Sequence, residues 1–268
     1  MNLKNKKLFL LDMDGTIYLD DYLFDGVLDF LAEIKSRGGR YIFMTNNSSK
    51  SVSAYIEKLQ NLGIEATSDD FMTSVDATIE FLKEKYGHEA LNKLIYIMGT
   101  QSFIDQMKDN GFKVTTDESP DVDIILCGFD RELTYKKLED ICRMLLDPNR
   151  SIDYYATNPD WVCPTDFGSV PDCGSMCQML EIATNRKPYF IGKPQPDMAL
   201  LSMKKTGFGP EDTLVIGDRL YTDIACGCNA GVDTCFVLSG EGTMEDLDKY
   251  DVKPTYILGN IAELLRRI

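Results

Sequence analysis

The sequence predicts an α/β protein in which helices wind around a parallel sheet and a large α/β segment is inserted between the two halves of that sheet. Short apolar segments alternate with amphipathic helical segments at both ends of the chain. The middle of the chain repeats the alternation without a Gly-, Ser- or Pro-rich linker at its borders. Alternation of this kind favours parallel strands joined by right-handed crossovers.

The N-terminal part reads strand, helix, strand, helix. KKLFLLDMD at 6–14 and RYIFM at 40–44 predict strands, and SKSVSAYIEKLQNLG at 49–63 predicts a helix that ends at a glycine. The helix predicted between the two strands carries four apolar residues on one face: Val27, Leu28, Leu31 and Ile34.

The C-terminal part follows the same order. Strands are expected at PYFIG, DTLVIGD and VDTCFVL, with helices between them and a last strand and helix in TYILGNIAELLRRI. We expect PYFIG, at 188–192, to join the same sheet as the N-terminal strands. The segments KLIYIMG, GFKVTT, VDIILCGF and SIDYYAT form a further α/β region. The predicted domains are therefore 1–77 with 187–268 as the core and 78–186 as the insert.

Composition restricts the class of protein. Hydrophobic residues make up 44% and charged residues 26% of 268 residues, and no apolar run reaches the roughly 18 residues of a membrane span. The basic start lacks a small-residue cleavage site, so we expect a cytoplasmic protein that does not bind membranes. The eight cysteines are then expected as free thiols, and their spacings include no C-x-x-C that would favour structural zinc.

Charge excludes further classes. A net charge of −15 without a basic stripe argues against nucleic-acid binding. The single histidine, His88, lies in the polar stretch KEKYGHEA and is expected at the surface. Mechanisms built on a histidine base or on several histidine ligands are therefore nearly excluded. Neither G-x-G-x-x-G nor G-x-x-x-x-G-K-[ST] occurs, which excludes nicotinamide and P-loop nucleotide chemistry.

Carboxylates follow two of the predicted strands. Asp12 and Asp14 come directly after the first strand, and Asp218 follows TLVIG with Asp223 five residues on. The carboxyl ends of parallel strands form the functional edge of such sheets. A turn at Asp12–Gly15 and a helix N-cap at Asp218 are the structural alternatives.

Two other predicted strand exits suit a phosphoryl group. Thr45 and Asn46 begin the run TNNS, which offers a hydroxyl, amides and the backbone N–H groups of a coming helix. Helix capping by Ser48 or Ser49 is the alternative use of this run. Lys193, after PYFIG, brings one ammonium group, although a lysine in a turn is also an ordinary surface residue.

Acidic residues gathered at one sheet edge need a counter-charge. Asp12, Asp14 and Asp218 would raise one another's pKa values unless a divalent cation neutralised them. Oxygen ligands together with phosphate chemistry indicate Mg²⁺.

The motifs DMDGT, TNNSS, GKP and GDRLYTD, in this order, resemble those of the haloacid dehalogenase (HAD) superfamily of phosphohydrolases. The resemblance covers both halves of the core and implies a Rossmann-like core with an inserted C2-type cap. The run ATNPDWVCP at 156–164 is similar to the cap loop of the NagD-like or p-nitrophenylphosphatase branch. This chain departs from that branch in one respect. The segment after the cap loop is typically P-G-x-G in the branch, but here it reads Pro171-Asp172-Cys173-Gly174.

The resemblance also implies residue roles. Asp12 attacks phosphorus to form an aspartyl-phosphate, and Asp14 protonates the leaving group and then activates water. The remaining roles form two sets. The phosphoryl oxygens would be held by Thr45, Asn46 and Lys193. The metal would be bound by the Asp12 carboxylate, the Asp14 backbone carbonyl and the Asp218 carboxylate, with Asp223 as a ligand or in support.

The implied substrate is a small phosphomonoester such as a sugar phosphate or a nucleoside monophosphate, with Asn158 and Asp160 of the cap loop as contacts. A hinge or turn is the alternative use of this loop. The carboxyl at position 14 favours a phosphatase over a dehalogenase, because a departing alkoxide needs a proton and a halide does not. A homodimer is compatible with the resemblance.

Two alternatives from another functional class stay open. A non-catalytic phospho-acceptor of the receiver type also gathers acids, a threonine and a lysine, but it needs about half this length. A phosphate-sensing relative without turnover would keep the same fold.

Overall fold

The computed structural model describes residues 3–165 and 167–268 and divides them into two compact units. The core unit comprises the chain up to Thr45, Val52–Thr73 and Lys193–Ile268. The inserted unit comprises Asn46–Ser51 and Ser74–Gly192. The borders at Thr73 and Lys193 lie a few residues from the predicted 77 and 187, whereas Asn46–Ser51, predicted in the core, belongs to the inserted unit. The predicted domain bounds stay a prediction.

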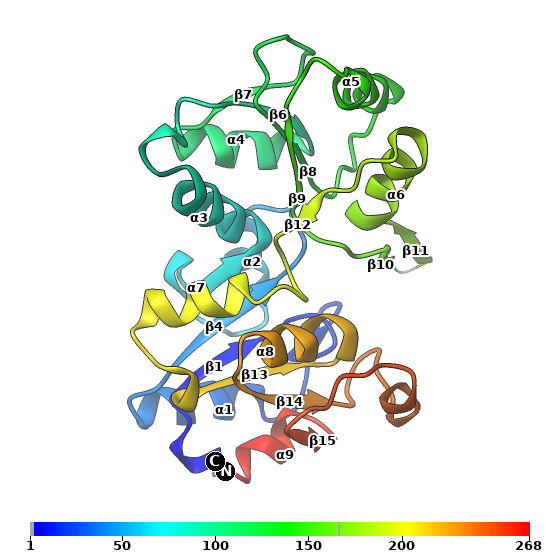
Figure 1. Cartoon of the computed structure of the whole chain (residues 1–268). Helices are drawn as coiled ribbons and strands as arrows, with labels where there is room; N and C mark the ends of the chain where they lie inside the picture. Colours follow the sequence, from blue (N-terminus) through cyan, green and yellow to red (C-terminus); the bar gives the residue numbers. More distant parts are fainter. Residues whose placement is uncertain (1–2, 166) are drawn as a thin grey trace. The chain divides into compact units, whose positions relative to one another are not determined.

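The core unit contains a six-stranded sheet in the order β15-β14-β13-β1-β4-β5, with every neighbouring pair parallel (Figure 1). The predicted α/β class is confirmed. In the same order, the strands are Tyr256–Leu258, Asp233–Val237, Thr213–Gly217, Leu8–Leu11, Arg40–Thr45 and Phe71–Thr73. A short hairpin, β2 (Tyr18–Leu19) and β3 (Tyr22–Leu23), follows β1.

Helices cover both faces of this sheet. The α-helices of the core unit are α1 (Val27–Ser36), α2 (Val52–Asn61), α7 (Asp197–Thr206), α8 (Ala225–Asn229) and α9 (Ile261–Leu265). The single-turn 3₁₀ elements are η1 (Leu3–Asn5), η2 (Ser68–Asp70), η4 (Pro210–Asp212) and η6 (Met244–Asp248), and η5 (Leu220–Ile224) is a π-helical turn.

Strand alternation decides which helices meet which face. Phe9 and Leu11 pack with apolar residues of α1, α2 and α9 in one buried cluster. The alternate residues point to the other face, where α7 contacts β1, β4 and β5, and α8 contacts β13 and β14. In α1 the predicted face is correct for Val27, Leu31 and Ile34, whereas Leu28 is 47% exposed.

The inserted unit has its own parallel sheet, in the order β12-β9-β8-β6-β7. In that order the strands are Tyr189–Phe190, Asp153–Ala156, Ile124–Cys127, Leu94–Met98 and Lys113–Thr115. A hairpin is formed by β10 (Val162–Thr165) and β11 (Gly168–Pro171). The helical elements are α3 (Ser74–Tyr86), η3 (Gly87–Glu89), α4 (Gln101–Asp109), α5 (Tyr135–Leu146) and α6 (Cys173–Thr184). Figure 1 shows α5 and α6 on one side of this sheet and α3 and α4 on the other.

One strand assignment was wrong. PYFIG was expected in the core sheet, but its strand β12 pairs with β9, so it is an edge strand of the inserted unit's sheet. The segment has only two residues in regular pairing, and Tyr189 is 44% exposed. An apolar run of this length does not tell which of two parallel sheets it will join.

The position of His88 and the character of the helices bear on two of the predictions from the sequence. The side chain of His88 is 93% exposed, so its predicted surface position is confirmed. In the part of the chain that the structure describes, no helix combines the length and the apolar character that crossing a bilayer requires.

Candidate active site

Two adjacent strands of the core sheet deliver the first two carboxylates. β1 ends at Leu11 and β13 ends at Gly217, and the next residues are Asp12 and Asp218. The backbone N–H of Asp12 donates to the carbonyl of Ile216 at 2.9 Å, so the parallel register continues to the point where the carboxylates begin. The predicted convergence of these strand exits on one sheet edge is what the structure shows.

The third carboxylate arrives from the turn after β13. Asp223 lies in η5, and its Oδ2 accepts a hydrogen bond from the backbone N–H of Arg219 at 3.1 Å. Gly217 permits this approach, because a Cβ at that position would collide with the Asp223 side chain. The helical turn begins after Arg219, so Asp218 is not the N-cap that the sequence offered as an alternative.

Asp12, Asp218 and Asp223 form one cluster of acidic ligands. One carboxylate oxygen from each residue lies within 4.8 Å of the others. Asp218 and Asp223 are each 1% exposed. Buried carboxylate oxygens at this spacing are the donor set that hard divalent cations such as Mg²⁺ or Ca²⁺ prefer. The chemistry of these donors therefore fits a divalent cation, while the Asp14 carboxylate lies outside the cluster.

Lys193 contacts two carboxylates of this cluster, and one of them, Asp12, is the predicted nucleophile. Its Nζ lies 2.5 Å from Asp12 Oδ1 and 2.6 Å from Asp223 Oδ1, and it also donates to the carbonyl of Met44 at 3.4 Å. The residue is 3% exposed. Burial by itself would lower the pKa of Lys193, but the carboxylates of Asp12 and Asp223 outweigh burial and raise it. The ammonium group is therefore permanently charged beside the two carboxylates.

Burial sets the protonation of the acids. It raises the pKa of Asp12 well above its usual value, and Asp223 adds to this while Lys193 opposes it. Burial and then Asp223 raise the pKa of Asp218 to about 6. A bound cation would reverse both directions, because it favours the carboxylate form.

The raised pKa of Asp218 predicts how the stability of the metal-free protein depends on pH. The unfolded Asp218 carboxyl has a pKa of about 4, so the folded metal-free protein holds an extra proton between about pH 4 and 6. Stability is lost as the pH rises through that window, by about 3 kcal/mol. A cation needs the carboxylate and offsets this loss, so Mg²⁺ should raise the thermal unfolding midpoint more at pH 7 than at pH 5. Equal shifts at the two pH values would contradict it.

Asp218 is held in place by both neighbouring loops. Its Oδ1 accepts from Thr16 Oγ1 at 3.5 Å, and its Oδ2 accepts from the backbone N–H of Glu241 at 2.7 Å. Gly15 has φ +83°, and a Cβ at that position would lie 2.8 Å from Asp218 Cγ. Sequence reasoning missed Thr16 and Glu241. The threonine of DMDGT was a usable signal, whereas nothing in the sequence marks Glu241.

Gly15→Ala should weaken metal binding. The added Cβ would displace Asp218, in addition to the strain of about 1 kcal/mol that a left-handed alanine carries. We expect the Mg²⁺ concentration for half-maximal stabilisation against thermal unfolding to rise about 10-fold, which corresponds to about 1.4 kcal/mol of binding free energy. Gly38→Ala is the matched control, because Gly38 has φ +71° and a Cβ there meets nothing within 4 Å. An equal Mg²⁺ requirement in the two variants would contradict the expectation.

The residues predicted to hold phosphate lie in different units. Thr45 is the last residue of β4, beside β1 in the core sheet, and it is 7% exposed. Asn46 begins the segment that packs with the inserted unit, where its Nδ2 donates to Asp160 Oδ2 at 2.9 Å. The helix cap expected at Ser48 or Ser49 was wrong, because α2 begins at Val52. The Ser48 hydroxyl instead accepts from the Phe129 backbone N–H.

The cap loop forms a polar network inside the inserted unit. Asn158 is completely buried, and its Nδ2 donates to Asp160 Oδ2 at 3.0 Å and to Asp172 Oδ1 at 3.1 Å. Asp172 also accepts from the Cys173 backbone N–H as the N-cap of α6. The carboxylate that stands in place of the branch's usual glycine therefore caps a helix and binds Asn158.

Comparisons with known proteins show the family to which this chain belongs. The sequence model described as haloacid dehalogenase-like hydrolase matches residues 9–113, and a HAD-hydrolase-like model matches residues 190–264. The acid sugar phosphatase of Staphylococcus saprophyticus is 30% identical over 266 residues, which are 99% of this chain and 99% of that protein. The chain belongs to the haloacid dehalogenase-like hydrolases.

Solved structures define the branch of this haloacid dehalogenase-like hydrolase. The 4-nitrophenylphosphatase of Thermotoga maritima has a TM-score of 0.89 at 38% identity, covering 98% of each chain. NagD from E. coli K-12 has a TM-score of 0.86 at 28% identity, again covering 98% of each chain. The chain is therefore a phosphatase of the NagD-like and p-nitrophenylphosphatase branch, and its inserted α/β unit is the cap domain. The predicted family, fold and enzyme class are confirmed.

Proposed function

We propose that this protein is a Mg²⁺-dependent phosphomonoester hydrolase that acts on a small phosphorylated metabolite through an aspartyl-phosphate. The observation that carries the proposal is the contact of Lys193 with Asp12 at 2.5 Å beside the carboxylates of Asp218 and Asp223. An ammonium group and a cation site next to one strand-exit carboxylate supply the positive charge that a transferring phosphoryl group requires.

The proposed reaction proceeds in two steps. In the first, an Asp12 carboxylate oxygen bonds to phosphorus, the bond from phosphorus to the leaving oxygen breaks, and Asp14 gives that oxygen a proton. In the second, water attacks phosphorus, Asp14 takes the proton from the water, and the Asp12–phosphorus bond breaks. Inorganic phosphate and the free carboxylate result.

Three residues would position the phosphoryl oxygens, namely Thr45, Asn46 and Lys193. The cation would be held by the carboxylates of Asp12, Asp218 and Asp223 and by the backbone carbonyl of Asp14. When bound, Mg²⁺ neutralises negative charge on the phosphoryl oxygens and on the surrounding acids. Lys193 favours the carboxylate form of Asp12 and fixes the direction of its side chain, since it bonds to one of the two carboxylate oxygens.

The proposed substrate class is a sugar phosphate or nucleoside monophosphate, with p-nitrophenyl phosphate as an artificial substrate. Relatives named as an acid sugar phosphatase and as a 4-nitrophenylphosphatase support this class. Of the two cap-loop residues predicted as substrate contacts, Asp160 is proposed to make the contact, because Asn158 is completely buried. Asp160 is only partly buried, and the Asn158 amide that bonds to it would fix its direction. The cytoplasmic location and the homodimer stay predictions from the sequence.

Hydrolysis of p-nitrophenyl phosphate with Mg²⁺ and with excess EDTA tests the proposal. We expect turnover with Mg²⁺, loss of turnover with EDTA, and recovery when Mg²⁺ is restored. A screen of sugar phosphates and nucleoside monophosphates by phosphate release would then define the class. A protein that takes up phosphate without releasing it would instead be a phospho-acceptor, and one that only binds phosphate would be a sensor; either result would overturn the proposal.

A further inference from the structure

Both carboxylate oxygens of Asp14 have partners in the core unit. Oδ1 lies 3.8 Å from Lys58 Nζ, and Oδ2 accepts a hydrogen bond from the Tyr18 hydroxyl at 3.4 Å. The Asp14 side chain is itself 60% exposed. A carboxylate this exposed would otherwise rotate freely, so these two groups restrict the directions in which it points.

Tyr18 is a fixed platform for this arrangement. It is completely buried, and its backbone carbonyl accepts from the Gly15 N–H at 2.8 Å, which ties β2 to the loop that carries Asp14. Burial and then the nearby Asp14 raise the pKa of the Tyr18 hydroxyl, so it remains a proton donor in this contact.

The ammonium group of Lys58 lies over the aromatic ring of Tyr18. It belongs to α2, and its Nζ lies 3.8 Å from the centroid of the Tyr18 ring, within the range of a cation–π interaction. The ammonium group is thus placed by the ring on one side and by Asp14 on another. Its side chain is 25% exposed.

We propose that Lys58 is a positioning residue that, together with Tyr18, aims the Asp14 carboxylate for proton transfer to the leaving oxygen. The inference rests on the proposed function, because it assigns Asp14 as the proton donor. Lys58 comes from the helix after TNNSS and lies far from Asp14 in the sequence, whereas Tyr18 begins the hairpin that follows DMDGT.

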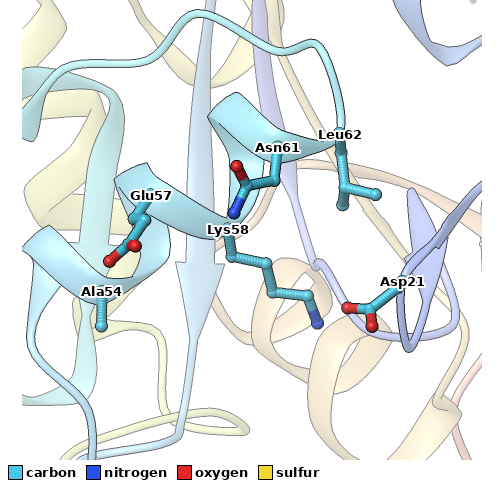
Figure 2. A pocket seen from close by; sticks show the side chains of 6 residues that line it. All are labelled: Asp21, Ala54, Glu57, Lys58, Asn61 and Leu62. Carbon is cyan, nitrogen blue, oxygen red and sulfur yellow. The ribbon is translucent and has the colours of Figure 1, made fainter.

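A purely structural role explains these contacts poorly. Ion pairs between partly exposed side chains add little stability. Lys58 also borders a pocket of about 410 Å³ in the core unit, formed with Asp21, Ala54, Glu57, Asn61 and Leu62 (Figure 2). Replacing a side chain at the edge of an open pocket leaves no cavity in the packed core, so activity should change without loss of the fold.

The test compares two aryl phosphates of similar shape. The phenolate that leaves phenyl phosphate is far more basic than p-nitrophenolate, so only the former depends strongly on a well-placed proton donor. In Lys58→Met, which keeps the stem over the Tyr18 ring, kcat/KM should fall about 10-fold for phenyl phosphate and less than about 3-fold for p-nitrophenyl phosphate. Lys58→Arg should recover most of the loss, and Tyr18→Phe should reproduce the substrate dependence.

Lys35→Met is the matched control, because the Lys35 ammonium also lies over a tyrosine ring, 5.1 Å from the centroid of Tyr41, on the exposed side of α1. It should leave both rates unchanged. Equal losses for the two substrates in Lys58→Met, or no loss for either, would overturn the inference while the proposed function stands. If the wild type hydrolyses neither substrate with Mg²⁺, the proposed function fails and the inference fails with it.

Discussion

Asp12→Asn should reduce kcat/KM for p-nitrophenyl phosphate by about 10⁴-fold or more, because the amide cannot act as the nucleophile. The amide keeps the shape of the carboxyl group. Burial and Asp223 disfavour the charged form of Asp12, so removal of its charge should not destabilise the fold. Lys193 keeps a carboxylate partner in this variant, at 2.6 Å in Asp223. The loss should therefore be one of chemistry, with an unchanged unfolding midpoint.

The measurement has two parts. Steady-state rates with Mg²⁺ give the loss, and acid-quenched wild-type protein is digested to find one phosphoryl group on the peptide that contains Asp12. Asp29→Asn is a suitable control, because Asp29 is an exposed carboxylate on α1 in the same unit. Full activity in Asp12→Asn, or a phosphoryl group on another residue, would refute the nucleophile assignment.

The sequence was sufficient where a residue's place follows from its own strand. Asp12 and Asp218 end apolar strands, and parallel strands place their carboxyl ends at one edge, so their proximity was predictable. Asp223 was predictable for a related reason, because it follows Asp218 five residues on, less than two helical turns away. The structure adds the distances and the Lys193 contacts that make this group a chemical site.

The sequence was insufficient where a position depends on long-range packing. The two-residue strand before Lys193 could pair with either of two parallel sheets, and neighbouring strands rather than local periodicity decided the outcome. Asn46 follows a core strand, yet its amide bonds to Asp160, which is 114 residues away in the sequence. Lys58 reaches Asp14 from a predicted helix, and Tyr18 reaches it from a hairpin that the sequence analysis did not predict.

Lys193→Met should cost both activity and stability. The variant keeps the aliphatic stem but leaves Asp12 and Asp223 without the ammonium group that contacts both. Removing one partner of a buried ion pair typically costs about 3 to 5 kcal/mol. Losing a cation that contacts the nucleophile should reduce kcat/KM by about 10³-fold. Because Mg²⁺ would neutralise the same carboxylates, it should restore part of the stability but little of the activity.

Lys6→Met separates these two effects. Lys6 is also a buried lysine of the core unit, 6% exposed, and it pairs with Asp233 at 2.8 Å and donates to the Glu211 carbonyl at 2.8 Å. Both variants should unfold at lower denaturant concentrations than the wild type, but only Lys193→Met should lose kcat/KM under conditions in which the protein remains folded. If Lys6→Met loses as much activity as Lys193→Met, the effect is one of stability, and Lys193 has no direct part in holding Asp12 or the phosphoryl group.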